Sequence, residues 1–318
     1  MSSGLVSSRA LGVAVGLLLD RAFGEPPTAL HPVAWFGTAM GRVEETLYPR
    51  SPRLRRPAGA LYAATGLLLG AAAGAVLPVS IAVGVASAGR MLRHTSAEIE
   101  TLLVAGDLKG AREKLPWLVG RDPSGLDESG VAAAVVESLA ENTVDAVIAP
   151  AFWGLVAGAP GVLAHRAVNT MDAMVGHRSE RYARFGTAAA RLDDVMAWVP
   201  ARVFAGLVAL DAGSRGAGGT AWHVLKVVAR DAGAHPSPNA GVAESAVAAA
   251  LRVELGGPLR YGERVEERPA LGDGPRPQAA DIARARGVVD RVELMVALAA
   301  LTGWALTRSR KRRWRRNS

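Results

Sequence analysis

The sequence predicts an all-α, multi-pass integral membrane protein, with amphipathic or soluble-looking helical insertions and Gly/Pro-rich loops between its apolar helices. Half of the 318 residues are hydrophobic but only 5% are aromatic, so small aliphatic residues carry the apolar character, which favours close helix packing. Residues 57–89 contain no charged side chain, whereas about 20 apolar residues already span a bilayer. No segment of strand length alternates polar with β-branched residues, and this argues against a sheet.

Composition also limits the kinds of site and partner. The chain has no cysteine, which excludes disulfides, thiolate metal sites and cysteine nucleophiles. The net charge is +8, but seven basic residues lie in the tail, residues 308–318, so the rest of the chain is nearly neutral. We expect no nucleic acid among the partners. The positive-inside rule predicts that the tail is cytoplasmic and contacts anionic lipid.

The apolar segments, taken in order, define the expected membrane helices. Residues 11–19 come first, and no convincing small-residue cleavage site follows them, so they do not resemble a cleaved signal peptide. Residues 57–89 would be ~50 Å long as one helix, so we expect them to tilt, protrude or break near Pro78. The alternative, a buried Ala-rich helix of a soluble protein, is disfavoured by this length. Weaker candidates are residues 146–164, 195–210 and 294–307, for about four or five membrane-associated helices in one domain, residues 1–318.

Three polar stretches lie between the apolar segments. Residues 90–122, within a soluble-looking insertion at 90–136, have helical spacing and alternating charge, which predicts a helical hairpin that turns at Gly106 and Asp107. Residues 212–219 are rich in glycine and predict a loop. Residues 261–277 are dense in glycine, proline and charge, and predict an irregular loop.

An acidic stripe is the first candidate site. Residues 131–150 favour a helix, which Pro150 is expected to end. Glu137, Glu141 and Asp145 are spaced i, i+4, i+8, which places three carboxylates on one helical face. Oxygen ligands of this kind suit Mg²⁺. The alternative is an ordinary solvated polar face.

A second candidate site follows the apolar residues 146–164. Arg166, Asn169 and Asp172 lie at three-residue steps and so share a helical face. Clustered arginines then follow, and such clusters bind phosphates through bidentate hydrogen bonds. Local ion pairing on the surface is the alternative. The arginines are Arg178, Arg181 and Arg184.

A rigid loop, "HPSPNAG" at residues 235–241, is the third candidate. Its prolines precede a helix expected from about Val242, and the amides at a helix start attract anions. His235, Ser237 and Asn239 are its polar side chains. A rigid turn without chemistry is the alternative. There is no P-loop and no Rossmann glycine fingerprint, so a nucleotide must be held in another way.

Another polar stretch follows the first apolar segment. Asp20, Glu25 and His31 lie in it and either belong to the site or shape a turn.

Several of these motifs together resemble the CobD/CbiB family, the adenosylcobinamide-phosphate synthases of cobalamin biosynthesis. The resemblance covers most of residues 11–276, and the motifs occur in the family's order. Two positions depart from the pattern: Glu25 stands where the family usually has Asp, and His177 where it usually has Tyr. The motifs are "GEPPTALHPV", "ESLAENTVDAVIAP", "RAVNTMDAMVGHRSERYARFG", "ARLDDVMAWVPAR", "HPSPNAG" and "LGGPLRYG".

The resemblance implies a multi-pass enzyme of the cell membrane. The family joins a propionate of adenosylcobyric acid to (R)-1-amino-2-propanol or its O-phosphate, with ATP as co-substrate. Such a reaction needs Mg²⁺ and cationic groups around the transferred phosphoryl group. The expected partners are therefore the corrinoid, the amine and membrane lipid, with a homo-oligomer as a possible assembly. A transporter, or a non-catalytic membrane sensor like the AmpE proteins, is the alternative.

Roles follow for the candidate residues as this reaction would use them. The expected metal ligands are Glu137, Glu141 and Asp145. The expected catalytic residues are Glu141, Asp145, Asp172 and His235, the last as a base for the amine. The expected ligands of substrate and phosphate are Asn142, Arg166, Asn169, Arg178, Arg181, Ser237 and Asn239.

Residues 146–164 separate the acidic stripe from the arginines. A single crossing would put the two about 30 Å apart, whereas one phosphoryl-transfer site needs both at the same phosphates. Pro150, Gly158 and Pro160 interrupt the segment. We therefore predict a re-entrant or broken segment that returns to its starting side, with both polar edges facing the cytoplasm.

Overall fold

The computed structural model describes residues 3–120, 122–177, 179–216, 221–261 and 264–317. Their regular secondary structure is helical apart from one two-stranded sheet, so the expected all-α class is confirmed in its main part. The chain divides into two compact units, and each is assembled from separate stretches of sequence. Unit 1 comprises residues 1–88, 145–197 and 296–318; unit 2 comprises residues 89–144 and 198–295.

Unit 1 is a packed set of helices. Its elements are α1 (Ser3–Phe23), a short 3₁₀ turn (Thr28–Leu30), α2 (Pro32–Leu47), α3 (Arg55–Ala75), α4 (Val79–Ala86), a π-helical turn (Val144–Ile148), α8 (Ala149–Val156), α9 (Ala159–Val175), α10 (Tyr182–Phe185), the first part of α11 (Thr187–Ser214) and the last part of α14 (Ala279–Asn317). An apolar core around Met40, Tyr62, Met171 and Phe185 holds α2, α3, α9 and α10 together.

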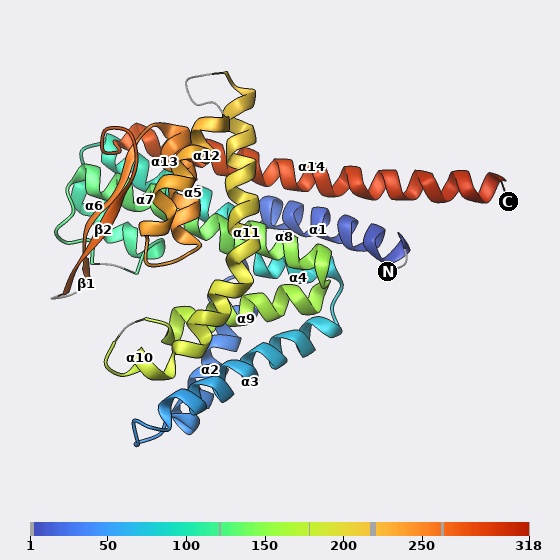
Figure 1. The fold of residues 1–318 in the computed structure, drawn as a ribbon, viewed down its shortest axis with the longest axis horizontal. Coiled ribbons are helices and arrows are strands. Elements are labelled where there is room, and N and C mark those ends of the chain that lie inside the picture. The colour runs from blue at the N-terminus through green and yellow to red at the C-terminus, as the bar shows by residue number, and fades with distance from the viewer. Residues whose placement is uncertain (1–2, 121, 178, 217–220, 262–263, 318) are drawn as a thin grey trace. The chain divides into compact units, whose positions relative to one another are not determined.

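Helices α3 and α9 lie side by side in unit 1 (Figure 1). Glycines of α3 at four-residue spacing make this close approach possible. A Cβ atom at Gly70 would lie 2.5 Å from the carbonyl oxygen of Leu163, and one at Gly74 would lie 2.4 Å from that of Ala159. Small residues at this spacing let helix backbones meet.

The uncharged residues 57–89 break as the sequence predicts. Helix α3 ends at Ala75, and α4 begins at Val79 directly after Pro78, where the missing N–H of proline costs no helical hydrogen bond. Among the described residues, α3 and α11 are the two helices long and apolar enough to cross a membrane. That is fewer than the number of membrane-associated helices expected.

Residues 146–164 also break, but Pro150 does not end the preceding helix as expected. Instead the helix passes into the π-helical turn, and Pro150 lies in the first turn of α8, a position that proline tolerates. The break comes at Gly158, whose φ of 71° is a left-handed conformation that suits glycine. Helix α9 then packs back against α8, so the segment forms a helical hairpin.

Unit 2 contains the expected insertion. Its elements are α5 (Gly89–Val104), α6 (Leu108–Lys114), a 3₁₀ turn (Leu115–Trp117), α7 (Glu128–Thr143), the rest of α11, α12 (Ala221–Asp231), a 3₁₀ turn (Ala232–Ala234), α13 (Ala240–Leu251), β1 (Glu254–Tyr261), β2 (Arg264–Gly272) and the start of α14. The predicted turn between α5 and α6 is confirmed: Gly106 has a φ of 75°, and the Asp107 carboxylate accepts a hydrogen bond from the Gly110 amide at 2.8 Å.

The irregular loop expected at residues 261–277 is wrong in part, because β1 and β2 pair there as an antiparallel hairpin (Figure 1). The strands lack the usual alternation, and backbone pairing with a bulge near Gly256 holds them. Gly256 has a φ of 87°, a conformation open to glycine. The other expected loop spans residues 212–219. Helix α11 continues through its first residues to Ser214, and residues 217–220 lie outside the described part of the chain.

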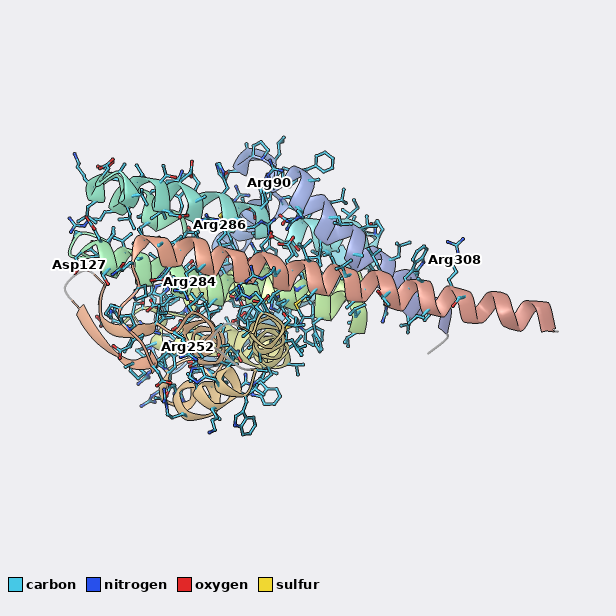
Figure 2. The ribbon with its side chains drawn as sticks, turned by 90° about the horizontal axis from the view of Figure 1, so that it is seen from above. Arg90, Asp127, Arg252, Arg284, Arg286 and Arg308 are labelled. Atoms are coloured by element: carbon cyan, nitrogen blue, oxygen red, sulfur yellow. The ribbon has the colours of Figure 1, made fainter. Side chains whose placement is uncertain are left out.

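Helix α14 begins in unit 2, where two arginines of its first turns fix it. Arg286 forms an ion pair with Glu100 of α5 at 2.7 Å, and Arg284 donates to the carbonyl oxygen of Leu251 at 2.6 Å. Figure 2 shows both side chains beside the α14 ribbon. The helix continues to Asn317, so residues 308–317 of the tail form the end of this helix.

Candidate functional site

The helical hairpin of unit 1 brings Asp145, just before residues 146–164, together with Asn169, just after them. Asn169 of α9 donates from Nδ2 to the Oδ2 atom of Asp145, at 3.0 Å, and to the Oδ1 atom of Asp193, at 3.3 Å. Asp193 comes from α11, and Asp172 of α9 also acts on it electrostatically. We call Asp145, Asn169, Asp172 and Asp193 the aspartate cluster. Three carboxylates in one region of a protein favour a cationic partner.

Arg166 is the cation beside the aspartate cluster. Its Nη1 atom donates to Oδ1 of Asn169 at 3.2 Å, so the amide of Asn169 is held at both ends. Burial lowers the pKa of Arg166, while Glu25, Asp145 and Asp193 act in the opposite direction. These carboxylates keep a buried guanidinium charged. The predicted face of α9 thus converges on one polar site.

Glu25 and His31 are neighbours in the polar stretch that follows α1. Glu25 lies 3.3 Å from Nε2 of His31, whose Nδ1 atom accepts from the Val33 amide at 3.2 Å and caps α2. His31 therefore shapes the turn, while Glu25 faces Arg166 electrostatically. The two alternatives for this stretch thus apply to different residues: His31 shapes the turn, and Glu25 lies close enough to act on Arg166 of the site.

The three carboxylates of the acidic stripe lie in different surroundings. Glu137 is buried, and its Oε1 atom accepts from the Gly256 amide of the hairpin at 2.9 Å. Glu141 is exposed on α7. Asp145 lies in the π-helical turn that directly follows α7, and a shared role of the three carboxylates stays a prediction.

The structure gives no metal-ligand set for the expected Mg²⁺. Over the described residues, no group of three or more His, Asp or Glu side chains is arranged to hold a metal ion. In the aspartate cluster, the Asn169 amide donates to one oxygen of Asp145 and to one oxygen of Asp193. Metal binding by Glu137, Glu141 and Asp145 stays a prediction from sequence.

Arg181 is exposed and pairs with Glu44 of α2. Its Nη2 and Nε atoms donate to Oε1 of Glu44 at 2.8 and 3.2 Å, and the Tyr182 hydroxyl donates to the same oxygen at 2.8 Å. The guanidinium also lies over the Tyr48 ring, 4.5 Å from its centroid. These contacts hold the segment before α10 against α2. Arg178 lies outside the described residues.

Asn142 lies on α7 in unit 2 and is also bound internally. Its Nδ2 atom donates to the Ser138 hydroxyl at 2.8 Å, and that hydroxyl donates to the carbonyl oxygen of Leu118 at 2.9 Å. The pair connects α7 to the end of the insertion that contains α5 and α6.

The "HPSPNAG" loop forms a second polar group, in unit 2. Helix α13 begins at Ala240, close to the expected start. The Ser237 hydroxyl accepts from the amides of Asn239 and Ala240 at 3.3 and 3.2 Å. The sequence predicts that the amides at the start of this helix attract an anion. In the structure, the loop's own serine binds two of them.

His235 faces cationic and anionic neighbours in this loop. Its Nε2 atom lies against the Arg268 guanidinium and 3.8 Å from Glu244. On the other side of the ring, the Ser237 amide donates to the Nδ1 atom at 3.0 Å, and the Ser237 carbonyl oxygen lies 3.1 Å from the same atom. A role for His235 as the base for the amine stays a prediction from sequence.

Sequence reasoning gave no role to Asp193 or Arg202, although both lie in the motif "ARLDDVMAWVPAR". Arg202 donates to Oδ1 of Asn239 at 2.8 Å and stacks on Trp198, 4.4 Å from the ring centroid. The available signal was a pair of aspartates and an arginine in an otherwise apolar stretch, which are costly in a membrane protein and therefore point to function.

Comparison with known proteins gives one consistent result. A sequence model of the family described as "CobD/Cbib protein" matches residues 13–289. The cobalamin biosynthesis protein CobD of Mycobacterium bovis is 45% identical over 298 residues, which cover 90% of this chain and 92% of the relative. The protein of the same name from Rhodobacter capsulatus is 41% identical over 316 residues, 93% of this chain and 98% of the relative. No solved structure matches.

Proposed function

The chain belongs to the CobD/CbiB family of cobalamin biosynthesis, and from that premise we propose that it is the ATP-dependent ligase that joins adenosylcobyric acid to (R)-1-amino-2-propanol or its O-phosphate. The product is adenosylcobinamide or its phosphate. We further propose that the enzyme works as a multi-pass protein of the cell membrane. The two apolar helices α3 and α11 support the membrane location.

One observation carries the proposal of an enzyme: three motifs that are far apart in the sequence meet in the aspartate cluster. Asp145 comes from "ESLAENTVDAVIAP", Asn169 from "RAVNTMDAMVGHRSERYARFG" and Asp193 from "ARLDDVMAWVPAR". A chain that needed these residues only for stability would not need to gather carboxylates, since like charges repel when they are brought together.

The reaction divides into two steps. ATP transfers its γ-phosphoryl group to the propionate carboxylate, which gives an acyl phosphate and ADP. The amine nitrogen then attacks the carbonyl carbon, phosphate leaves, and the proton of the ammonium must pass to a base. Asp145 and Asp193 are suited to bind the ammonium and to accept its proton, and Arg166 is suited to an anionic group beside it.

The test is an assay of the purified protein in detergent. Adenosylcobyric acid, Mg-ATP and either aminopropanol or its O-phosphate are supplied, and the products are identified by mass spectrometry. We expect a corrinoid amide with release of ADP and phosphate in equal amounts. Binding or transport of the corrinoid without amide formation from either amine would indicate a sensor or a transporter and overturn the proposal.

A further inference from the structure

A buried histidine of unit 1 has no explanation in the fold. His165 of α9 is fully buried, and neither ring nitrogen has a hydrogen-bond partner among the described residues. Buried polar side-chain groups in proteins are almost always hydrogen-bonded, so an exception needs a reason. His165 is also one residue from Arg166, which lies at the aspartate cluster.

The helical register shows on which side of α9 this histidine lies. Helix α3 packs on the face that contains Leu163, Ala167 and Met171. At 3.6 residues per turn, the first two of these point about 160° away from His165. His165 therefore lies on the opposite face, which it shares with Asn169 and Asp172 at i+4 and i+7.

The charge state of His165 limits what it can bind. Burial and the neighbouring Arg166 lower the pKa of His165 to about 3, so the imidazole is neutral at physiological pH. One ring nitrogen of a neutral imidazole donates a hydrogen bond and the other accepts one. The side chain thus offers two hydrogen bonds without adding charge.

The aspartate cluster selects among the substrates. Phosphates and the corrinoid carboxylate are anions, which Asp145, Asp172 and Asp193 repel. The amino alcohol carries an ammonium and a hydroxyl or phosphate ester, so its cationic end suits this face. A neutral imidazole can accept a hydrogen bond from its nitrogen without repelling it.

We propose that His165 is a further substrate-binding residue, whose imidazole hydrogen-bonds the amine end of the amino alcohol beside Asn169 and the carboxylates. The inference rests on the proposed function, because that function supplies the amine. It assigns the amine to the His165 face of α9, and no role in amine binding to His235.

The experiment compares the wild type with His165→Leu and His165→Gln. We expect the leucine variant to raise KM for the amine at least about tenfold and to leave KM for ATP and the corrinoid unchanged. Glutamine keeps one donor and one acceptor, so it should recover part of the loss. The melting temperature of His165→Leu should equal or exceed that of the wild type, because an apolar side chain removes buried polar atoms that have no partner.

Tyr62→Phe is the matched control. Tyr62 of α3 is fully buried in unit 1, and its hydroxyl has no partner among the described residues. The substitution therefore removes a comparable polar atom without touching the His165 face of α9. We expect unchanged kinetics and an equal or higher melting temperature.

Two results would overturn the inference in an active enzyme: a wild-type KM for the amine in His165→Leu, or a melting temperature that falls while that of Tyr62→Phe does not. The second would mean that His165 has a structural role, such as holding a buried water. If the wild type forms no amide, titration calorimetry with aminopropanol O-phosphate separates failure of the proposed function from failure of the inference about His165. Binding that His165→Leu loses supports the inference without the proposed function, and absence of binding to the wild type overturns both.

Discussion

Asn169 is the residue on which the candidate site depends. Its amide nitrogen donates to Asp145 and Asp193, and its amide oxygen accepts from Arg166. An amide can donate to carboxylates from its nitrogen and accept from a guanidinium at its oxygen. A carboxylate in its place could not donate, and it would add a negative charge to the three already there.

We therefore expect Asn169→Asp to reduce amide synthesis at least ~10-fold, since loss of a hydrogen bond to a charged group costs about 1.5–3 kcal/mol. Initial rates at saturating substrates, with folding checked by the melting temperature, measure the effect. Gln278→Glu is the matched control because it makes the same amide-to-carboxylate change at an exposed position. Equal rates for wild type and Asn169→Asp would show that the aspartate cluster is not the site.

Arg181, which the sequence predicts to bind phosphate, forms an ion pair with Glu44 in the structure. We predict that Glu44→Gln and Arg181→Leu each lower the free energy of unfolding. The double variant should lose no more than the sum of the two single losses, and the coupling energy between the residues should be about 1 kcal/mol or less. Thermal unfolding of the four proteins measures this coupling. A loss of ATP or amine affinity in Arg181→Leu that Glu44→Gln lacks would restore the phosphate role.

The π-helical turn shows how one element decides the geometry of the site. It displaces the register between α7 and α8, and the carbonyl oxygen of Ala146 within it accepts from the Ala88 amide at 3.1 Å. Such turns often mark functional positions, because the inserted residue redirects a side chain. Here the turn contains Asp145, and the α8–α9 hairpin that follows returns the chain to it at Asn169.

The contact of α12 with the β1–β2 hairpin gives a prediction about the pH dependence of stability. The hydrogen bond from Arg230 lowers the pKa of Asp231, as does the Gly272 amide, which donates to Asp231 Oδ2 at 2.9 Å. A carboxyl group whose pKa is lowered in the folded state stabilises that state at pH values above its ordinary pKa of about 3.9. This stabilisation is lost as the pH falls below that value. We expect the wild type to melt above Asp231→Asn at pH 7, and this difference to shrink below about pH 4.

Melting curves from pH 3 to 7 measure this dependence. Asp127→Asn is a suitable comparison, because Asp127 is an exposed helix cap that accepts one backbone hydrogen bond. A constant difference between the wild type and Asp231→Asn across the pH range would contradict the assignment.

At the scale of the whole molecule, the proposed membrane location leads to a prediction about topology. Each unit is built from separate stretches of sequence, and α3 and α11 are the candidate spans. The hairpin of α8 and α9 has the geometry of a segment that enters and returns, and non-helical backbone at its tip is tolerated in a bilayer when protein surrounds it. Figure 2 shows Arg308 extending from the C-terminal part of α14, where its guanidinium also lies over Trp304.

We predict that cysteines placed at Glu141, Ala173 and Ser309 react with an impermeant thiol reagent from the same face of oriented vesicles. All three positions are exposed, and the chain has no native cysteine, so each label reports one site. Labelling of Glu141→Cys and Ala173→Cys from opposite faces would mean that residues 146–164 cross the membrane once. Labelling of Ser309→Cys alone from the other face would contradict only the prediction that the tail lies on the cytoplasmic side.

The sequence by itself determined the helical class and several breaks in it, because these depend on local chemistry. Pro78 cannot continue a helix, and Gly106 and Gly158 adopt left-handed conformations that glycine tolerates best. It also determined the family, since long polar motifs in an apolar chain are distinctive. Local spacing further placed Arg166 and Asn169 on one face of α9, as the structure confirms.

Only the tertiary structure decided which polar residues meet. The register shift in the π-helical turn, the choice of Glu44 as the partner of Arg181, and the approach of Asp193 to Asn169 all depend on packing between elements distant in sequence. The β-hairpin formed for the same reason, because backbone pairing across strands needs no alternating pattern in the side chains. Spacing along a chain predicts which side chains share a face, but the partner of that face is selected by the free energy of the whole fold.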